Sequence, residues 1–260
     1  MSTLPESIDP DRRRFSIRLP RLLWIGLATV VLSVAAFGLS IGVPIYRQRV
    51  AVQEIERRGG EVLTRKNGQD WMRPWLGDDR MRTFESVEAV KLEGSQVTDA
   101  DLDHIQWLTR LEVLSLRGTN VSDQGVERLI RLRNLKHLTL DGTQVTDKGL
   151  EYVRGLAKLQ KLSLAETQVT GAGLAQLVGL TNLTSLNLDG TAISDADLAP
   201  LKEMKSITAL GLEKTHVTDS GLEELNGVTG LAHIRIGQTP VTDAGISELK
   251  RAFPKVTVSH

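Results

Sequence analysis

The chain has 260 residues and carries 32 basic and 32 acidic side chains, so its formal net charge at pH 7 is zero. Residues 1–87 hold 14 basic and 10 acidic side chains, which leaves 18 basic and 22 acidic ones for residues 88–260. The mildly acidic balance of this second part argues against nucleic-acid binding, which requires a basic face, and the absence of cysteine excludes disulfides, thiol nucleophiles and cysteine-based metal sites.

The N-terminal part divides into a basic tail and an apolar segment. Residues 1–21 are polar and contain five arginines, and we expect a disordered tail. Leu22–Tyr46 follows with 25 uncharged residues. As a helix this segment would be about 37 Å long, enough to cross a hydrocarbon core of about 30 Å. A signal peptide has an apolar region of only about 7–15 residues. We therefore predict an uncleaved transmembrane helix, with cleavage near residues 34–36 as the alternative.

The distribution of arginine predicts the orientation of this helix. Five arginines precede Leu22, whereas only Arg47 and Arg49 follow Tyr46 closely. Because cytoplasmic flanks are enriched in Lys and Arg, the N-terminus is expected in the cytoplasm and the rest of the chain outside it, in the periplasm or envelope.

Residues 47–86 are predicted to form a juxtamembrane helix and an N-terminal cap. The helix is expected to stop at Gly59-Gly60, a short strand to cover residues 61–66, and Asn67-Gly68 to form a tight turn. A cluster of large apolar residues follows: Trp71, Trp75, Leu76, Met81 and Phe84. We interpret the cluster as the cap that a solenoid needs on its first repeat; a ligand pocket on the two tryptophans is the alternative.

Residues 87–260 consist of about seven 24-residue repeats and a terminal strand. The unit reads L-x-x-L-x-L-x-x-T-x-V-T-D-x-G-L, and one threonine column keeps the spacing without a slip after Ser95: Thr119, Thr143, Thr167, Thr191, Thr215 and Thr239. A fixed period of this length is typical of a solenoid. The L-x-L pair in each unit predicts a strand with a buried face, and the following apolar residues at spacing three predict a short α or 3₁₀ helix. Residues 253–258 are expected to form the closing strand.

Three polar or small columns have expected structural roles. The threonine hydroxyls are expected to bond to the backbone of the adjacent repeat. The aspartate column is expected to cap the helix starts and complement their dipoles; its members are Asp99, Asp123, Asp147, Asp195, Asp219 and Asp243. A calcium ladder is disfavoured because each repeat supplies one carboxylate and Gly171 interrupts the column. Glycines near the helix starts are expected to relieve crowding between repeats: Gly125, Gly149, Gly173, Gly221 and Gly245.

The repeated strand-and-turn pattern resembles the bacterial variety of the leucine-rich-repeat family, with threonine in the column where that family usually has Asn or Cys. The resemblance covers about residues 87–258, and the apolar N-terminal segment is similar to that of membrane-anchored members. It implies an α/β solenoid with a parallel sheet on the concave face and short helices on the convex face. It also implies use of the chain as a binding surface, and it does not imply a catalytic site.

The candidate protein-binding residues are polar concave-face positions that packing does not constrain. We select Arg117, His137, Asp141, Lys161, Asn187, Asp189 and Arg235. Their mixed charges favour a polar protein interface. Asp141 and Asp189 are expected to lie roughly 10 Å apart, two strand spacings, and could flank a basic residue of the partner.

The sequence offers little support for catalysis. It contains no phosphate-binding loop, HExxH or paired-carboxylate motif. Ser115, His137 and Asp141 could approach one another, but no nucleophile elbow accompanies them. We therefore predict a membrane-tethered, non-enzymatic scaffold that recognises a protein at the cell envelope, with no metal, cofactor, nucleic acid or small-molecule substrate. A self-associating envelope protein is the alternative, followed by an enzyme with a concave-face site.

Overall fold

The computed structural model describes residues 21–65, 74, 85–94 and 96–260. Most of the predicted tail, the Asn67-Gly68 turn and the Trp71–Phe84 apolar cluster lie outside the described residues. The chain divides into two compact units, residues 1–43 and residues 44–260.

Helix α1 (Arg21–Arg57) covers both the predicted transmembrane segment and the predicted juxtamembrane helix, and it includes Pro44. Its stretch Thr29–Arg57 is long and apolar enough to cross a membrane, as judged from length and composition. The helix ends as predicted: Gly59 has a φ of 78°, and the Gly60 N–H donates to the Ile55 carbonyl at 2.9 Å. A left-handed glycine of this kind is a frequent helix stop.

The described part of the second unit contains one nine-stranded sheet whose strands follow each other in chain order. The first two strands are antiparallel and all later pairs are parallel. Leu114 lies opposite Leu138, and Leu138 opposite Leu162, so each step across the sheet is one repeat, as predicted. The strands are β1 (Glu61–Arg65), β2 (Ser86–Lys91), β3 (Val113–Ser115), β4 (His137–Thr139), β5 (Lys161–Ser163), β6 (Ser185–Asn187), β7 (Ala209–Gly211), β8 (His233–Arg235) and β9 (Thr257–Ser259).

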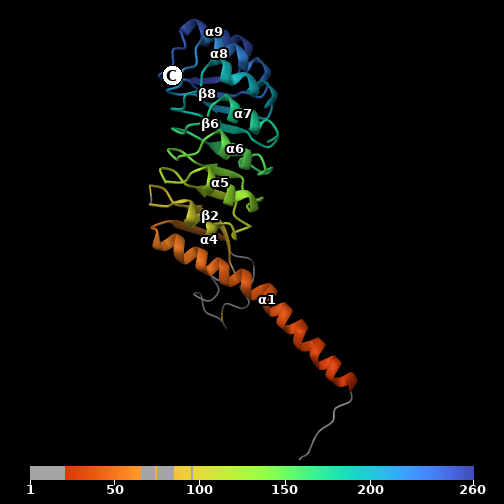
Figure 1. The fold of residues 1–260 in the computed structure, drawn as a ribbon. Coiled ribbons are helices and arrows are strands. Elements are labelled where there is room, and N and C mark those ends of the chain that lie inside the picture. Colours follow the sequence, from red (N-terminus) through yellow and green to blue (C-terminus); the bar gives the residue numbers. More distant parts are fainter. Residues whose placement is uncertain (1–20, 66–73, 75–84, 95) are drawn as a thin grey trace, which may run out of the picture. The chain divides into compact units, whose positions relative to one another are not determined.

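Short helices connect the parallel strands and lie along one side of the sheet (Figure 1). We call each strand with its following helix a coil. Most helices begin after a Ser or Thr in extended conformation, which is a favourable N-cap. The helices are η3 (Asp99–Asp101), α4 (Leu102–Ile105), α5 (Asp123–Arg128), η4 (Leu129–Arg131), α6 (Asp147–Val153), α7 (Gly171–Leu177), η5 (Asp195–Glu203), α8 (Asp219–Glu224), η6 (Leu225–Gly227) and α9 (Asp243–Ala252).

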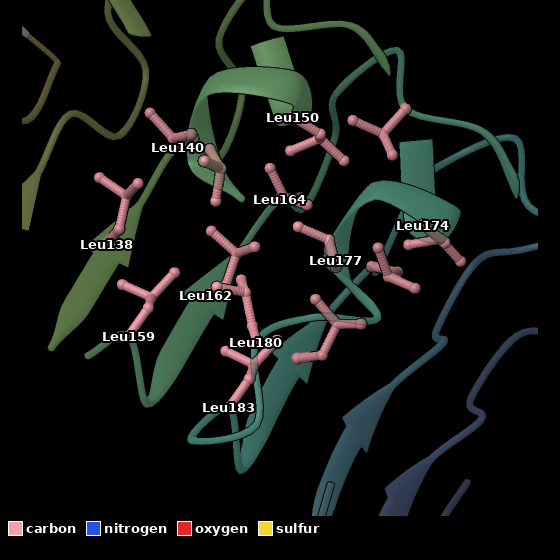
Figure 2. Packing of buried hydrophobic residues seen from close by; sticks show 14 of the residues in the cluster. Leu138, Leu140, Leu150, Leu159, Leu162, Leu164, Leu174, Leu177, Leu180 and Leu183 are labelled. Carbon is pink, nitrogen blue, oxygen red and sulfur yellow. The ribbon is translucent and has the colours of Figure 1, made fainter. Parts of the chain in front are cut away.

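The core is a continuous stack of leucine side chains between the sheet and the helices. In the middle coils, Leu162 of the strand and Leu164 just after it point toward the helix residues Leu174 and Leu177 of the same coil (Figure 2). All four are at most 1% exposed. Burying a leucine contributes about 1.5–3 kcal/mol, and each coil adds the same set, so the repeat pattern itself specifies the core.

Both ends of this stack are covered. At the first coil, Ala51 and Ile55 of α1 are buried in the repeat core, and β1 adds an antiparallel strand to the sheet edge. At the other end, β9 pairs with β8, so the chain closes on a strand as predicted, but this strand covers Thr257–Ser259 and not residues 253–258. Phe253, which precedes it, is buried.

The threonine column bonds within its own coil, so the predicted inter-coil bond is wrong. The Thr143 hydroxyl donates to the Leu140 carbonyl at 2.6 Å, and the other members of the column repeat this contact. The hydroxyl is three residues beyond a carbonyl at the end of the strand, and the turn brings the two together. This satisfies a buried polar pair locally.

The aspartate column provides the link between coils. The Asp123 carboxylate accepts from the Thr146 backbone N–H at 2.8 Å and from the Thr146 hydroxyl at 2.7 Å. The carboxylates of Asp99, Asp147, Asp195 and Asp219 bind the N-cap residue of the next coil in the same way. The predicted capping of their own helices is wrong, because the N-caps are the preceding Ser or Thr residues and the aspartates lie in the first helical turn. A Cβ on Gly149 would lie 2.6 Å from Asp123 Oδ1, so the glycine column makes room for this carboxylate, in agreement with its predicted role.

One coil departs from this rule at two positions that compensate each other. Gly171 replaces the aspartate, so Ser194 of the next coil receives no carboxylate from its neighbour. Asp197 occupies the glycine position instead, accepts from the Ser194 N–H at 2.8 Å and hydroxyl at 2.7 Å, and accepts from the Gly171 N–H at 3.0 Å. Burial tends to raise the pKa of Asp197, but these hydrogen bonds together lower it. The two coils are thus still linked, but here the carboxylate belongs to the later coil and accepts from the backbone of the earlier one.

Candidate protein-binding surface

The sheet face opposite the helices contains a hollow of about 520 Å³ over β4–β8. We call the face that carries it the concave face. The floor consists of small side chains, including Ser163, Ser185, Ala209 and Gly211. Larger polar side chains stand around this floor. The hollow is therefore built on regular strands, which hold its side chains in fixed positions.

The structure brings some of the predicted binding residues together and separates others. His137, Lys161, Asn187 and Arg235 line the hollow. The other three follow the strands: Arg117, Asp141 and Asp189. The small floor residues were not among the predicted binding residues, although a run of Ser, Ala and Gly at strand positions indicates a depression in the sheet face.

Gly211 allows a contact across two coils. The Arg235 guanidinium reaches over β7 and forms a salt bridge with Asp189. A Cβ on Gly211 would lie 2.4 Å from Asn187 Oδ1 and 2.7 Å from Arg235 Nη2. We predicted that a basic residue of the partner would lie beside Asp189. The chain itself supplies a basic residue there, Arg235.

Hydrogen bonds fix the polar groups around the hollow. Asn187 donates from Nδ2 to the Ser163 hydroxyl at 3.0 Å, and its Oδ1 accepts from the Asp189 N–H at 3.1 Å. Asp141 Oδ1 accepts from the Ala165 N–H at 3.1 Å. A partner would therefore meet a pre-organised surface, which lowers the entropy lost on binding.

Lys161 lies at one edge of this face, and carboxylates gather along the other edge, where Arg117 and Arg235 also lie. His137, Lys161 and His233 are the first residues of their strands, whereas carboxylates such as Asp189 and Glu213 follow the strand ends. Burial, with the charges of Lys161 and Lys136, lowers the pKa of His137.

On the other edge, burial raises the pKa of Asp189, and the carboxylates of Glu213 and Asp141 add to this effect. The Glu213 N–H and Arg235 oppose it. Several carboxylates thus lie near one another on this edge, and Arg235 neutralises one of them.

The residues considered for a triad do not form one. The Ser115 hydroxyl donates to Glu93 Oε1 at 2.8 Å, and Asp141 bonds to the backbone of the next coil. Within the described residues, His137 is hydrogen-bonded to neither side chain. The geometry therefore provides no activated nucleophile at this position.

Comparisons with known proteins agree with the observed repeat. A family model described as Leucine rich repeat matches residues 133–193. The solved structure of an internalin C2 from Listeria monocytogenes is 26% identical, with a TM-score of 0.50, over 62% of this chain and 73% of that chain. A second internalin from that species is 20% identical, with a TM-score of 0.41, over 74% of this chain and 67% of that chain. No curated protein matches the chain in sequence. The repeat register, the sheet and the first two of these matches show that the chain has a leucine-rich-repeat fold like that of a bacterial protein of this kind.

Proposed function

We propose that the chain is a membrane-tethered scaffold that recognises a protein partner at the cell envelope through the hollow of its concave face. The observation that carries this proposal is the hollow itself, whose polar rim is held in place and takes no part in the leucine core. Repeat solenoids use such extended concave surfaces for binding.

Lys161 on one edge and the carboxylates on the other indicate the chemistry of the partner. A partner segment with an acidic group near Lys161 and a basic group near Glu213 would match both edges of the face. The floor of small residues leaves space for a protruding side chain between them. Charge complementarity of this kind favours specificity and fast association more than high affinity, so we expect a transient complex.

The apolar part of α1 supports the membrane tether, because it is long enough to cross a bilayer. The five preceding arginines support a cytoplasmic N-terminus. A reporter enzyme fused after His260 should then be active only outside the cytoplasm, and protease added to spheroplasts should remove the repeats. Full protection of the repeats would contradict this orientation.

Site-specific cross-linking tests the binding surface. A photoreactive amino acid is placed at Ser185, in the floor of the hollow, and in a control at Lys148, which is exposed on a helix of the opposite side. The proposal predicts a discrete adduct with another protein in the cell from position 185 and none from position 148. An adduct that contains only a second copy of the chain would instead support self-association, and labelling from position 148 alone would place the interface on the wrong face.

A further inference from the structure

Trp107 lies in the first coil and carries two arginine side chains over its indole ring. The Arg47 guanidinium is 3.8 Å from the ring centroid, and the Arg131 guanidinium is 4.8 Å from it. Arg47 comes from α1, whereas Arg131 ends η4 in the next coil. Three segments of the chain thus converge on one aromatic ring, which attracts each cation through its π-face.

Among the described residues, no acidic side chain pairs with either of these two arginines. Both arginine side chains are exposed. The neighbouring Arg128, in contrast, is paired with Asp103 at 2.6 Å. Two like charges at one ring repel each other, and the repulsion is offset when an anion binds. The planar guanidinium fork suits phosphate oxygens, to which it can donate two parallel hydrogen bonds.

The place of Arg47 in the chain indicates which phosphate groups the two arginines can reach. Arg47 directly follows Tyr46, the last residue of the apolar segment. At a rise of about 1.5 Å per helical residue, Arg47 lies at the level of the lipid headgroups if that segment spans the bilayer. Arg47 and Arg131 both contact the Trp107 ring, so the three residues are held at the same level. Tryptophan is enriched at this depth because its ring is apolar and its N–H is polar.

We propose that Arg47, Trp107 and Arg131 form a docking site for the phosphate groups of membrane phospholipids. The site rests on the proposed membrane tether and adds a second contact between the first coils and the bilayer surface. Ile130, next to Arg131, is 47% exposed and supplies an apolar side chain at the same place. Anionic phospholipid is expected to strengthen the contact, and salt to weaken it.

The absence of cysteine allows a direct test with the full chain. Ile130→Cys and, as a distant reference on the last helix, Lys250→Cys are each labelled with a fluorophore. The labelled chains are reconstituted into vesicles of phosphatidylcholine and phosphatidylglycerol that contain a lipid with a quencher on its headgroup. Flotation of the vesicles reports the tether, and quenching reports contact with the headgroups.

Quenching at position 130 should exceed that at position 250. Arg131→Glu should reduce headgroup contact by at least about fivefold, which is the effect of losing one basic side chain at an anionic surface. The matched reversal Arg251→Glu on the last helix should leave quenching at position 130 unchanged, and circular dichroism checks that both variants are folded.

Equal quenching at both positions in a chain that floats, or no effect of Arg131→Glu, would overturn the docking site while leaving the tether intact. A chain that does not float overturns the tether and the docking site together.

Discussion

Exchanging the residues at positions 171 and 197 tests the rule that links neighbouring coils. In Gly171→Asp, the new Cβ would lie 2.5 Å from Asp197 Oδ1 and 2.7 Å from Asp197 Cα. The coils must shift, and two carboxylates become neighbours. Overpacking alone costs about 1–3 kcal/mol, and charge repulsion adds to this, so we expect a loss of about 2–3 kcal/mol in unfolding free energy.

Asp197→Gly removes the acceptor of three hydrogen bonds, two from Ser194 and one from the Gly171 N–H. Loss of a helix cap costs about 0.5–2 kcal/mol. In the double variant, the carboxylate introduced at position 171 can accept from Ser194 as Asp147 does from Thr170, and the glycine introduced at position 197 leaves the necessary space. We therefore expect the double variant within about 1 kcal/mol of the original chain, and a coupling energy near 3 kcal/mol, at the upper end for residues in contact.

The assay is denaturant unfolding of the full chain in detergent, followed by circular dichroism for the original chain, both single variants and the double variant. Rescue by the second substitution supports the reversed link. If the losses of the two single variants simply add in the double variant, positions 171 and 197 are independent and the rule is wrong.

Three further predictions concern stability. Leu162→Asp should lower the unfolding free energy by more than about 4 kcal/mol because it buries a charge in the leucine stack, whereas Lys161→Asp next to it should change it by less than about 1 kcal/mol; equal melting temperatures for the two would refute the strand register. Lys214 has a φ of 54°, so Lys214→Gly should stabilise the chain by about 0.5–1 kcal/mol because it relieves left-handed backbone strain. The control Lys148→Gly within α6 should destabilise the chain. A lower melting temperature for Lys214→Gly would contradict this prediction. Hydrogen bonds from the Thr242 hydroxyl and N–H lower the pKa of Asp219 in the folded chain. The stabilising effect of Asp219 is therefore complete above the ordinary aspartate pKa of about 3.9 and is lost as pH falls through the lower folded value. The unfolding free energy measured between pH 6 and 2 should depend less on pH in Asp219→Asn, and an unchanged pH dependence would argue against the contact.

The fold could be predicted from the sequence because each repeat carries the same information. The leucine columns specify the buried strand positions, and Thr or Ser before Asp specifies the helix starts. Leu138 and Leu162 are paired and buried as the 24-residue period requires. A single short L-x-L strand would be ambiguous; repetition in register removes the ambiguity.

The roles of the polar columns could not be assigned in the same way. Thr143 and Asp123 both belong to turns, and either could bond within its coil or to the next one. The choice depends on how far one coil is displaced from its neighbour, which the sequence pattern does not specify. The break at Gly171 was visible, but its compensation by Asp197 became evident only when the two coils were seen in contact.

The candidate site was predictable in position but not in detail. Lys161 and Asn187 follow from strand alternation alone. The pair formed by Arg235 and Asp189 joins residues two coils apart and requires the missing side chain of Gly211. The contacts of Trp107 likewise depend on three segments that are distant in sequence.

Filling the hollow shows whether the partner binds there. Ser185→Trp places a large side chain on the floor of the hollow, and Gln176→Trp places the same side chain on α7, on the helix side. The full chain with each substitution is compared with the original for capture of the protein that cross-links to position 185. We expect Ser185→Trp to weaken capture of the partner at least about tenfold, or about 1.4 kcal/mol. Gln176→Trp should leave capture unchanged. Undiminished capture by Ser185→Trp, together with loss of capture by Gln176→Trp, would contradict binding in the hollow.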